Sequence, residues 1–350
     1  TLFRSQGTTD AANGGSDLTD AAINEIAKKL AAGLSFSMDI DGVNYEIVQN
    51  PDGTLAIKFA TTTDTKVVIP DVIKIGDKVY RITEVYEKAF KDNATLKEVT
   101  ISQNVSKIGN SAFEGCTNLK KVTLKEGLIT IGDKAFKGCS SLTSITMPTT
   151  LQKIGNYAFE NCTKLKTVKL NDGLLTIGKK AFYSCKALKK VKIPKSVLKI
   201  GSYAFAKCAA LTSFTFATDS QLMSMGTGVL SNDKKLTKIK LPGKLTAVPS
   251  KAFKNDTKLA SITIGKSVTK IGAEAFNGCK AVKKVTIPTK VQTIGEKAFY
   301  NCKKLKNVSI KSKALTSVGE KAFKKCRKGL RIVVPGSKTA SYKKLLNGKY

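Results

Sequence analysis

The sequence predicts a solenoid of short stacked coils, in which parallel strands from successive coils form a long sheet. Two observations carry this prediction: an Ala-Phe pair recurs at a step of 23 residues, and the residues around each pair follow one apolar pattern. A unit of 23 residues cannot bury its own apolar edge. Neighbouring units must therefore cover one another, as the repeats of a solenoid do.

The phenylalanine of this pair fixes the register of the repeat. The step between units is 23 residues, except for 25 between Phe205 and Leu230 and 24 at the last unit; Leu230 fills the one place without a phenylalanine. The other members are Phe90, Phe113, Phe136, Phe159, Phe182, Phe205, Phe253, Phe276, Phe299 and Phe323. We therefore expect a right-handed coil of about 11 repeats.

Each part of the shared pattern L-x-x-V-x-I-P-x-x-V-x-x-I-G-x-x-A-F-x-x-C has its own structural meaning. The alternation in V-x-I predicts a short strand with one buried face. The proline after it ends the strand. The glycine after the second isoleucine permits a turn that a Cβ would hinder. The units should thus consist mostly of short parallel strands and turns.

The repeated motif IGDKAFKGCSSLTSITMP (Ile131 to Pro148) resembles the BspA-type leucine-rich repeat of bacterial cell-surface proteins. The resemblance covers residues 82–335 and implies an α/β-type leucine-rich repeat solenoid. Residues 36–81, with FSMDIDGVNYEIVQNPDGTLAIKF and VVIP, resemble the β-rich N-terminal cap of such proteins, and residues 336–350 resemble their ending with a short helix around Tyr342. The family implies an extracellular or cell-surface, non-enzymatic binding protein that adheres to host or microbial partners.

Residues 1–35 lie outside this resemblance. The stretch GTTDAANGGSD is typical of a linker, and Ile23, Ile26 and Leu30 have helical spacing, with Gly33 as a stop. This helix either packs on the cap or is the tail of an upstream domain. The sequence begins at Thr1 without a methionine, signal peptide or evident wall anchor, so we expect a processed or trimmed chain. It contains no apolar run of transmembrane length.

The eight cysteines share one place in the repeat, three residues after the phenylalanine. Asn93, Asp233 and Asp256 take that place in the other units. These three residue types are small and hydrogen-bond nearby backbone in turns. The sequence contains no C-x-x-C pair, which is the spacing typical of a zinc site. We expect a ladder of buried or turn-capping thiols, with disulfides between adjacent coils as the alternative.

The formal charge of +34 belongs to the repeats, because residues 1–95 carry a net −4 and residues 96–350 a net +38. Lys190 and Lys192 alternate with Val191 and Ile193, so they should point outward from the sheet. That outward face is the usual binding surface of leucine-rich solenoids, by analogy with the class. The candidate binding residues on it are Lys121, Lys169, Lys190, Lys192, Lys238, Lys240 and Lys284.

Four functions compete on this sequence. The first is binding of a host or microbial surface protein or glycan. The second is retention on an anionic polymer, such as a cell-wall polymer or a sulfated glycan, by the lysine-rich surface. Specific nucleic-acid binding is disfavoured because the phenylalanines are at core positions and the expected exposed tyrosines, Tyr157, Tyr183, Tyr203 and Tyr300, are scattered. Enzymatic activity has least support.

Neither a cofactor, nor a metal site, nor a catalytic residue is expected. The sequence has no histidine, and its glycines recur as turn residues in most units without forming a phosphate loop. Asp39, Asp41 and Asp52 suit hairpin turns of the cap. We expect a monomer. The irregular unit at residues 216–233 suggests either a functional loop or a tolerated defect.

Overall fold

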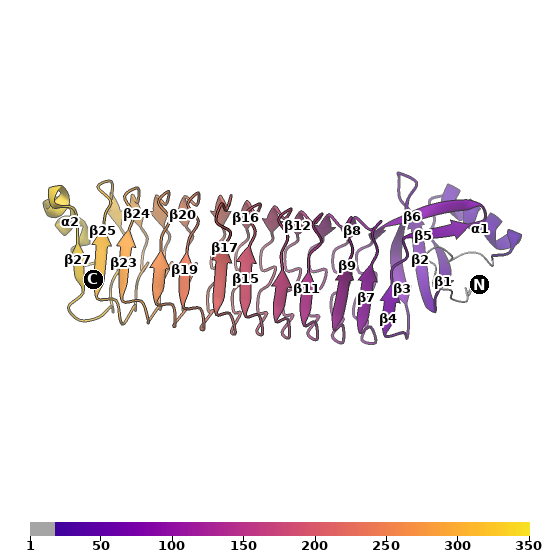
Figure 1. Cartoon of the computed structure of the whole chain (residues 1–350), viewed down its shortest axis with the longest axis horizontal. Helices are drawn as coiled ribbons and strands as arrows, with labels where there is room; N and C mark the ends of the chain where they lie inside the picture. The colour runs from indigo at the N-terminus through magenta and orange to yellow at the C-terminus, as the bar shows by residue number, and fades with distance from the viewer. Residues whose placement is uncertain (1–17) are drawn as a thin grey trace. The chain divides into compact units, whose positions relative to one another are not determined.

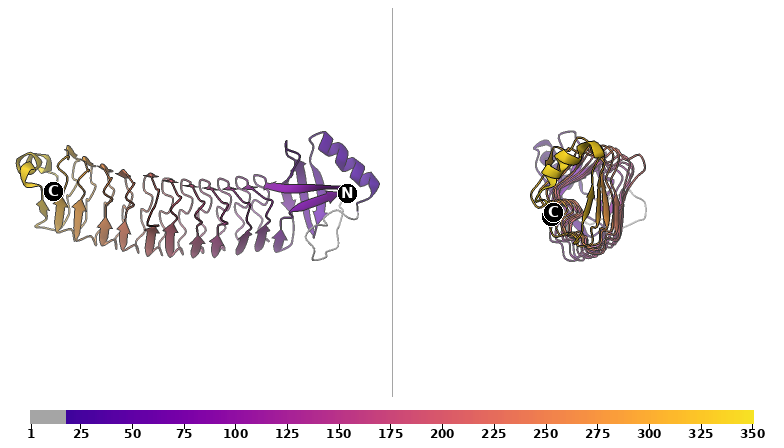
Figure 2. Two further views of the ribbon diagram at one scale, coloured as in Figure 1. Left: turned by 45° about the horizontal axis from the view of Figure 1, so that its top comes forward. Right: turned by 90° about the vertical axis from the view of Figure 1, so that its left-hand side faces the viewer.

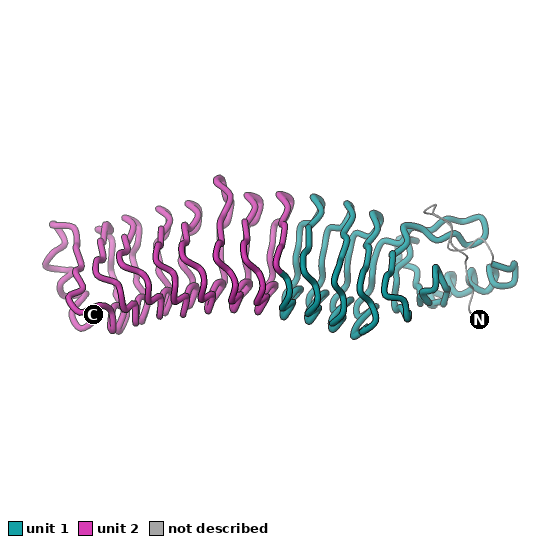
Figure 3. Tube along the Cα trace, turned by 60° about the horizontal axis from the view of Figure 1, so that its bottom comes forward, with its two compact units in different colours: residues 1–165 teal, residues 166–350 magenta. Residues whose placement is uncertain are grey.

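The computed structural model describes residues 18–350. The chain divides into two compact units, residues 1–165 (unit 1) and residues 166–350 (unit 2), which Figure 3 distinguishes by colour. The linker-like residues 7–17 lie outside the described part. Since the division falls inside the predicted repeat region, the four predicted domain segments stay predictions.

Unit 1 begins with a helix and a β-rich cap. Strands β1 (Phe36–Ile40), β2 (Val43–Gln49) and β3 (Leu55–Thr61) form an antiparallel meander, and β5 (Val72–Ile75) and β6 (Lys78–Val85) form a hairpin whose β6 runs parallel to β3. Asp41 and Gly42 both have positive φ in the first turn, as a two-residue hairpin of this type requires. The Asp39 carboxylate accepts the Gly42 N–H at 3.1 Å, and that of Asp52 accepts the Thr54 N–H at 3.0 Å. The predicted turn role of these aspartates is confirmed.

Helix α1 (Asp20–Ala31) packs on this cap, as Figure 2 shows. The Thr19 hydroxyl accepts the Ala22 N–H and caps the helix, while Ile26 and Leu30 are buried. Gly33, with a φ of 66°, follows the helix in the left-handed conformation of a C-terminal stop. The Ile23 side chain lies against Gly76, in the turn between β5 and β6. The predicted helix is therefore confirmed, and of its two possible roles the structure shows packing on the cap.

The repeats of unit 1 build two parallel ladders, one from each strand of the coil (Figure 1). The longer strands form the outward sheet and the two-residue strands form the second ladder, which continues from β6. The outward strands are β4 (Lys66–Val68), β7 (Glu98–Ile101), β9 (Lys121–Leu124) and β11 (Ser144–Thr146), and the second strands are β8 (Lys107–Ile108), β10 (Thr130–Ile131) and β12 (Lys153–Ile154).

Unit 2 repeats this arrangement with interruptions. Its outward strands are β13 (Thr167–Lys169), β15 (Lys190–Ile193), β17 (Ser213–Phe216), β19 (Lys238–Lys240), β21 (Ser261–Thr263), β23 (Lys284–Ile287), β25 (Asn307–Ile310) and β27 (Arg331–Val333). The second strands are β14 (Thr176–Ile177), β16 (Lys199–Ile200), β18 (Ser224–Met225), β20 (Ala247–Val248), β22 (Lys270–Ile271), β24 (Thr293–Ile294) and β26 (Ser317–Val318). The outward sheet breaks after β17 and again after β21, whereas the second ladder breaks only after β18. Both ladders thus break at the irregular unit.

Unit 2 ends in a short helical cap. A 3₁₀ turn (Gly336–Lys338) leads into α2 (Thr339–Leu346), which confirms the short helix predicted around Tyr342. The buried Tyr342 hydroxyl accepts the Leu315 N–H at 2.9 Å and donates to the Ser312 carbonyl at 3.2 Å. The Phe323 N–H, which a further coil would otherwise satisfy, donates to the Lys349 carbonyl at 2.8 Å. The segment that follows α2 therefore covers the last coil.

The phenylalanine ladder forms the centre of the core, as the Ala-Phe repeat predicts. Successive rings stack with centroids 5.0 to 5.3 Å apart and nearly parallel planes within each unit. At the irregular unit, where Leu230 replaces a phenylalanine, the ring of Phe205 instead meets Phe214 edge-on at 5.0 Å. Both stacked and edge-on pairs are favourable ring arrangements, so the core stays filled across the irregularity.

The cysteines form a second ladder beside the rings. The Cys116 thiol donates to the Phe90 carbonyl of the preceding coil at 3.0 Å, and six further thiols do the same to the matching carbonyl. Seven of the eight side chains are buried and Cys326 is half-buried, with none in a disulfide among the described residues. Burial raises the pKa of Cys116 to about 12 and that of Cys326 to about 11. The predicted buried, turn-capping ladder is confirmed.

The repeated glycine allows a close approach between the backbones of successive coils. A Cβ on Gly201 would lie 2.3 Å from the Lys179 backbone nitrogen of the preceding coil, and one on Gly295 would lie 2.5 Å from the Ala273 nitrogen. Real Cβ atoms do not approach backbone so closely. Glycine is thus required here by the spacing between coils, in addition to the turn that the sequence indicated.

Two buried aspartates replace thiols next to the irregular unit. The Asp233 carboxylate accepts the Cys208 N–H at 2.7 Å, and the Asp256 carboxylate accepts the Asp233 N–H at 2.8 Å. Both side chains are fully buried, and the Oδ2 atom of each has no hydrogen-bond partner. Burial, with the Asp256 charge added for Asp233, raises the pKa of both carboxyls well above their usual range.

Replacing one ring of the ladder should destabilise the protein strongly. Phe276 is fully buried and its centroid lies 5.2 Å from the rings of both Phe253 and Phe299. Phe276→Ala should lower the free energy of unfolding by about 3–5 kcal/mol, measured by urea titration followed by circular dichroism. The exposed control Lys266→Ala should change it by less than about 0.5 kcal/mol. A loss below about 1 kcal/mol for Phe276→Ala would contradict a continuous ring core.

The buried aspartates should make stability depend on pH. Their folded pKa is raised above the unfolded value, so their stabilising effect is full below the unfolded pKa of about 3.9 and is lost as pH rises toward the folded pKa. The titratable groups that face them are each other, Cys208 and Cys279. The double variant Asp233→Asn, Asp256→Asn keeps the accepting oxygens and should have a higher thermal midpoint at pH 8 and a flatter dependence from pH 4 to 8.

The matched control is Asp172→Asn with Asp219→Asn, which removes two exposed carboxylates from the same unit. It should leave the pH dependence of the thermal midpoint as it is in the unchanged protein. If the Asp233→Asn, Asp256→Asn variant is less stable at pH 8 and its thermal midpoint depends on pH as in the unchanged protein, the buried carboxyls do not cause the pH dependence.

Candidate binding groove on the outward sheet

The outward face of unit 2 presents lysines at alternate strand positions. On β15, Lys190 and Lys192 are exposed while Val191 and Ile193 between them are buried. β15 pairs in parallel with β13 and β17, so Lys190 lies beside Thr167 and Ser213 and Lys192 lies beside Thr215. The predicted outward orientation is confirmed for these residues.

The structure separates the seven predicted lysines, although all seven are exposed. Lys121 lies in unit 1 beside its parallel-strand partner Glu98, with which it forms an ion pair at 3.9 Å. Lys169, Lys190 and Lys192 come together in unit 2 around one groove. Lys238 and Lys240 on β19, and Lys284 on β23, lie outside that groove.

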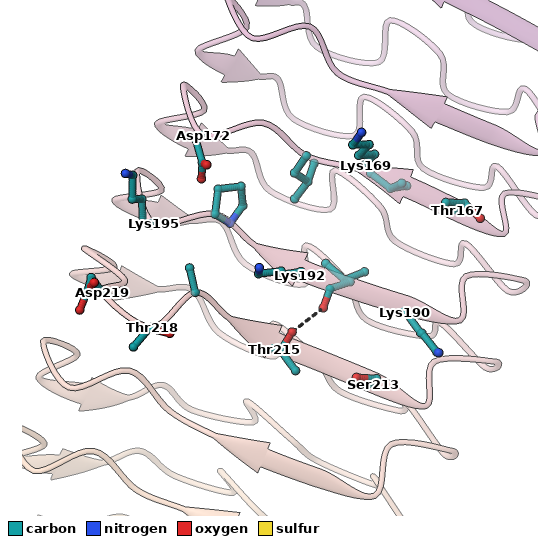
Figure 4. A pocket seen from close by; sticks show the side chains of 15 residues that line it. Thr167, Lys169, Asp172, Lys190, Lys192, Lys195, Ser213, Thr215, Thr218 and Asp219 are labelled. Atoms are coloured by element: carbon teal, nitrogen blue, oxygen red, sulfur yellow. Dashed lines mark hydrogen bonds between the residues drawn. The ribbon is translucent and has the colours of Figure 1, made fainter.

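The groove has a volume of about 760 Å³ and lies across β13, β15 and β17, as Figure 4 shows. Four lysines line it, because Lys195 from the turn after β15 joins the three on the strands. Thr167, Ser213 and Thr215 contribute hydroxyl groups. Val168, Val191, Pro194 and Ala217 contribute apolar surface. The groove therefore offers charged, hydroxyl and apolar contacts together.

The two-residue insertion of the irregular unit lies at this groove. Residues 217–223 connect β17 to β18, whereas residues 194–198 make the corresponding connection from β15 to β16. The longer turn brings Ala217, Thr218 and Asp219 to the rim of the groove (Figure 4). The sequence marked this segment as irregular, but only the fold shows which lysines it approaches.

Two carboxylates give the groove a mixed charge. Asp172 and Asp219 line its turn side, and in the described part of the chain neither forms an ion pair with the groove lysines. Sequence reasoning missed both, since the search followed lysines on strands and these aspartates lie on turns. Exposed charges of both signs, left unpaired, suit a partner with complementary charges.

The net charge of the chain lies entirely in unit 2. Residues 166–350 contain 41 lysines and arginines and 7 aspartates and glutamates, a net +34, whereas residues 1–165 are balanced. Three acids of unit 2, Glu274, Glu296 and Glu320, are ion-paired with lysines. The remaining four are the two groove carboxylates and the two buried aspartates. Most lysines of unit 2 are therefore left without an acidic neighbour.

The tyrosines expected to be exposed are instead half-buried: Tyr157, Tyr183, Tyr203 and Tyr300. The ring of Tyr183 is covered by the ammonium groups of Lys180 and Lys207, at 4.9 and 5.1 Å from its centroid. Lysine stems pack readily on aromatic faces in this way. These rings are thus engaged within the coil surface.

A smaller concavity of about 270 Å³ lies in unit 1, lined by Glu84, Tyr86, Glu87, Lys107, Gly109 and Asn110. The Lys107 ammonium pairs with Glu84 at 2.6 Å, and the Tyr86 hydroxyl donates to Asn50 at 2.9 Å. These polar groups are already engaged with other residues of unit 1, which makes this concavity the weaker candidate.

Two further observations limit the chemistry of residues 18–350. They contain no group of three or more side chains suited to hold a metal ion. No helix in this range is long and apolar enough to cross a membrane.

Comparison with known proteins identifies the repeats. The family model described as "BspA type Leucine rich repeat region (6 copies)" matches residues 83–212, 129–259 and 246–347. No curated protein matches the chain.

Among solved structures, a leucine-rich cell surface protein from Faecalibacterium prausnitzii is similar at 23% identity, covering 89% of this chain and 97% of that one, with a TM-score of 0.45. A leucine-rich repeat protein from Bacteroides ovatus has 24% identity, 87% and 96% coverage and a TM-score of 0.42. The T. pallidum leucine-rich repeat protein has 25% identity, 68% and 87% coverage and a TM-score of 0.42.

Proposed function

Because the chain belongs to the BspA-type leucine-rich repeat family, we propose that it is a non-enzymatic binding protein, secreted or exposed at a cell surface. It adheres to a host or microbial partner through the outward sheet of unit 2. A repeat scaffold suits this role because its core is independent of its outer face, so the face can be shaped for a partner.

The observation that carries the proposal is the position of the insertion. The coil that is two residues longer than its regular neighbours places the turn that contains the insertion at the rim of the groove on the outward sheet. Both ladders also break at this coil. Its location beside unpaired charges of both signs favours a protein partner with complementary charges.

Charge reversal in the groove should weaken adhesion. The unchanged protein should be retained on an array of purified matrix proteins at physiological salt, and Lys190→Glu with Lys192→Glu should lower the affinity at least about tenfold. The control Lys266→Glu with Lys290→Glu makes the same change in net charge on exposed residues outside the groove, and should lose less than about twofold. Equal losses in both variants, or retention no better than that of an inert basic protein, would contradict the proposal.

A second candidate function is retention on an anionic polymer by the surface of unit 2. The net +34 of residues 166–350 favours it, because so many unpaired lysines attract any polyanion.

Such binding should weaken steeply with salt. If 6–10 anionic groups are contacted, the affinity for dextran sulfate, measured by fluorescence anisotropy, should fall by about 10³-fold or more between about 50 and 200 mM sodium chloride. An affinity that stays unchanged over this range would exclude retention by charge.

A further inference from the structure

The three last coils of unit 2 share a cluster of cations that the groove does not include. The cluster lies where each coil passes from its cysteine to its outward strand, in the segments CKAVKK (279–284), CKKLKN (302–307) and CRKGLR (326–331). These segments contain no acidic residue. The terminal basic patch consists of Lys280, Lys283, Lys284, Lys303, Lys304, Lys306, Arg327, Lys328 and Arg331.

The backbone brings these segments into direct contact. The Lys306 N–H donates to the Lys283 carbonyl at 2.9 Å, and the Arg331 N–H donates to the Lys306 carbonyl at 2.8 Å. In the sheet formed by β23, β25 and β27, Lys284 pairs with Asn307 and Asn307 pairs with Arg331. At about 4.8 Å per coil and 3.3 Å per residue, nine cations are anchored within roughly 10 by 17 Å.

The cations fall into rows that follow the stacking of the coils. Lys280, Lys303 and Arg327 each directly follow the cysteine, so they form a row with one cation per coil. Lys283 and Lys306, joined by the backbone hydrogen bond, form a second row. Arg331 lies beside the end of this row, in the strand register of Lys284 and Asn307. A linear polymer that crosses the coils meets at least two cations at each step.

No group within unit 2 neutralises the patch. All nine side chains belong to exposed residues, and none takes part in an ion pair in the described part of the chain. The nearest acids in the sequence, Glu274, Glu296 and Glu320, lie between the second strand and the cysteine of their coils. Each is paired with a lysine outside the patch: Lys254, Lys297 and Lys349 respectively. The groove, by contrast, has two carboxylates of its own.

The chemistry of the patch favours sulfate or phosphate esters over nucleobases. Lysine offers a compact point charge that pairs with tetrahedral oxyanions, and seven of the nine cations are lysines. The three segments contain no aromatic residue, so single-stranded bases would find no ring on which to stack.

We infer that the terminal basic patch binds the sulfate or phosphate ester groups of a linear polyanion that runs across the last three coils. This inference rests on the second candidate function and gives it a site. It replaces attraction by the whole surface with a contact of defined position, to which each of the three coils contributes at least two cations.

The test compares two variants of the full chain with equal net charge. The patch variant carries Lys280→Gln, Lys283→Gln, Lys303→Gln and Lys306→Gln, and the control carries Lys199→Gln, Lys266→Gln, Lys270→Gln and Lys290→Gln, all exposed residues of unit 2. Circular dichroism and the thermal midpoint establish that both fold. Binding is measured by anisotropy with labelled dextran sulfate, inorganic polyphosphate and single-stranded DNA of mixed sequence.

The patch variant should lose at least about tenfold in affinity for the sulfated or the phosphate polymer, and the slope of log affinity against log salt should decrease by about 3. The control should change by less than about twofold. The polymer that binds more tightly identifies the oxyanion, sulfate or phosphate, and either result supports the patch.

Three outcomes would overturn the inference. Equal losses in both variants would mean that charge acts over the whole surface, which leaves the second candidate function standing without this site. Absence of binding by the unchanged protein would contradict both the second candidate function and the terminal basic patch as its site. Tighter binding of the DNA than of either polymer, lost in the patch variant, would make the partner a nucleic acid.

Discussion

The whole structure depends on the distance between one coil and the next. Parallel strands fix this distance near 4.8 Å, and every side chain inside must tolerate a copy of itself at that spacing. Rings satisfy it by stacking at 5.0 to 5.3 Å, and thiols satisfy it by donating to the carbonyl of the coil before. At Gly201 the backbones come so close that no Cβ fits. Similar residues therefore recur at most inward places, and this recurrence makes the 23-residue period visible in the sequence.

This constraint explains how much the sequence could predict. The inward places obey it, so the ring ladder, the thiol ladder and the strand alternation could be predicted from spacing alone; the cap and α1 could be predicted from turn residues and helical periodicity. Outward side chains face no such requirement. Lys121 and Lys190 share a repeat position, yet one lies beside Glu98 and the other beside Ser213. The groove depends on which turn contains the insertion, and a repeat pattern does not specify that position.

The irregular unit shows what the array does when the requirement fails. Over one coil the chain gains two residues, replaces a phenylalanine with Leu230 and replaces a cysteine with Asp233. Phe214 turns edge-on to Phe205, while the carboxylates of Asp233 and Asp256 accept backbone N–H groups. The turns remain joined, since the Leu230 N–H donates to the Ala252 carbonyl at 2.9 Å. The coils thus remain hydrogen-bonded through their turns where both sheets break. The longer turn after β17 lines the groove.

The same division between inside and outside explains why the charge of unit 2 is compatible with its fold. Two exposed ammonium groups about 7 Å apart repel by only about 0.6 kcal/mol in water, and salt screens part of that. Burying a single phenylalanine contributes several times more. The stability of the core therefore outweighs the repulsion between exposed lysines, and the positions of these lysines on the outer surface have little effect on folding. Acids nevertheless pair with lysines on the turns around Glu274 and Glu296, whereas the segments that enter β23, β25 and β27 have none. Folding energetics therefore do not determine where on the outer surface the cations lie.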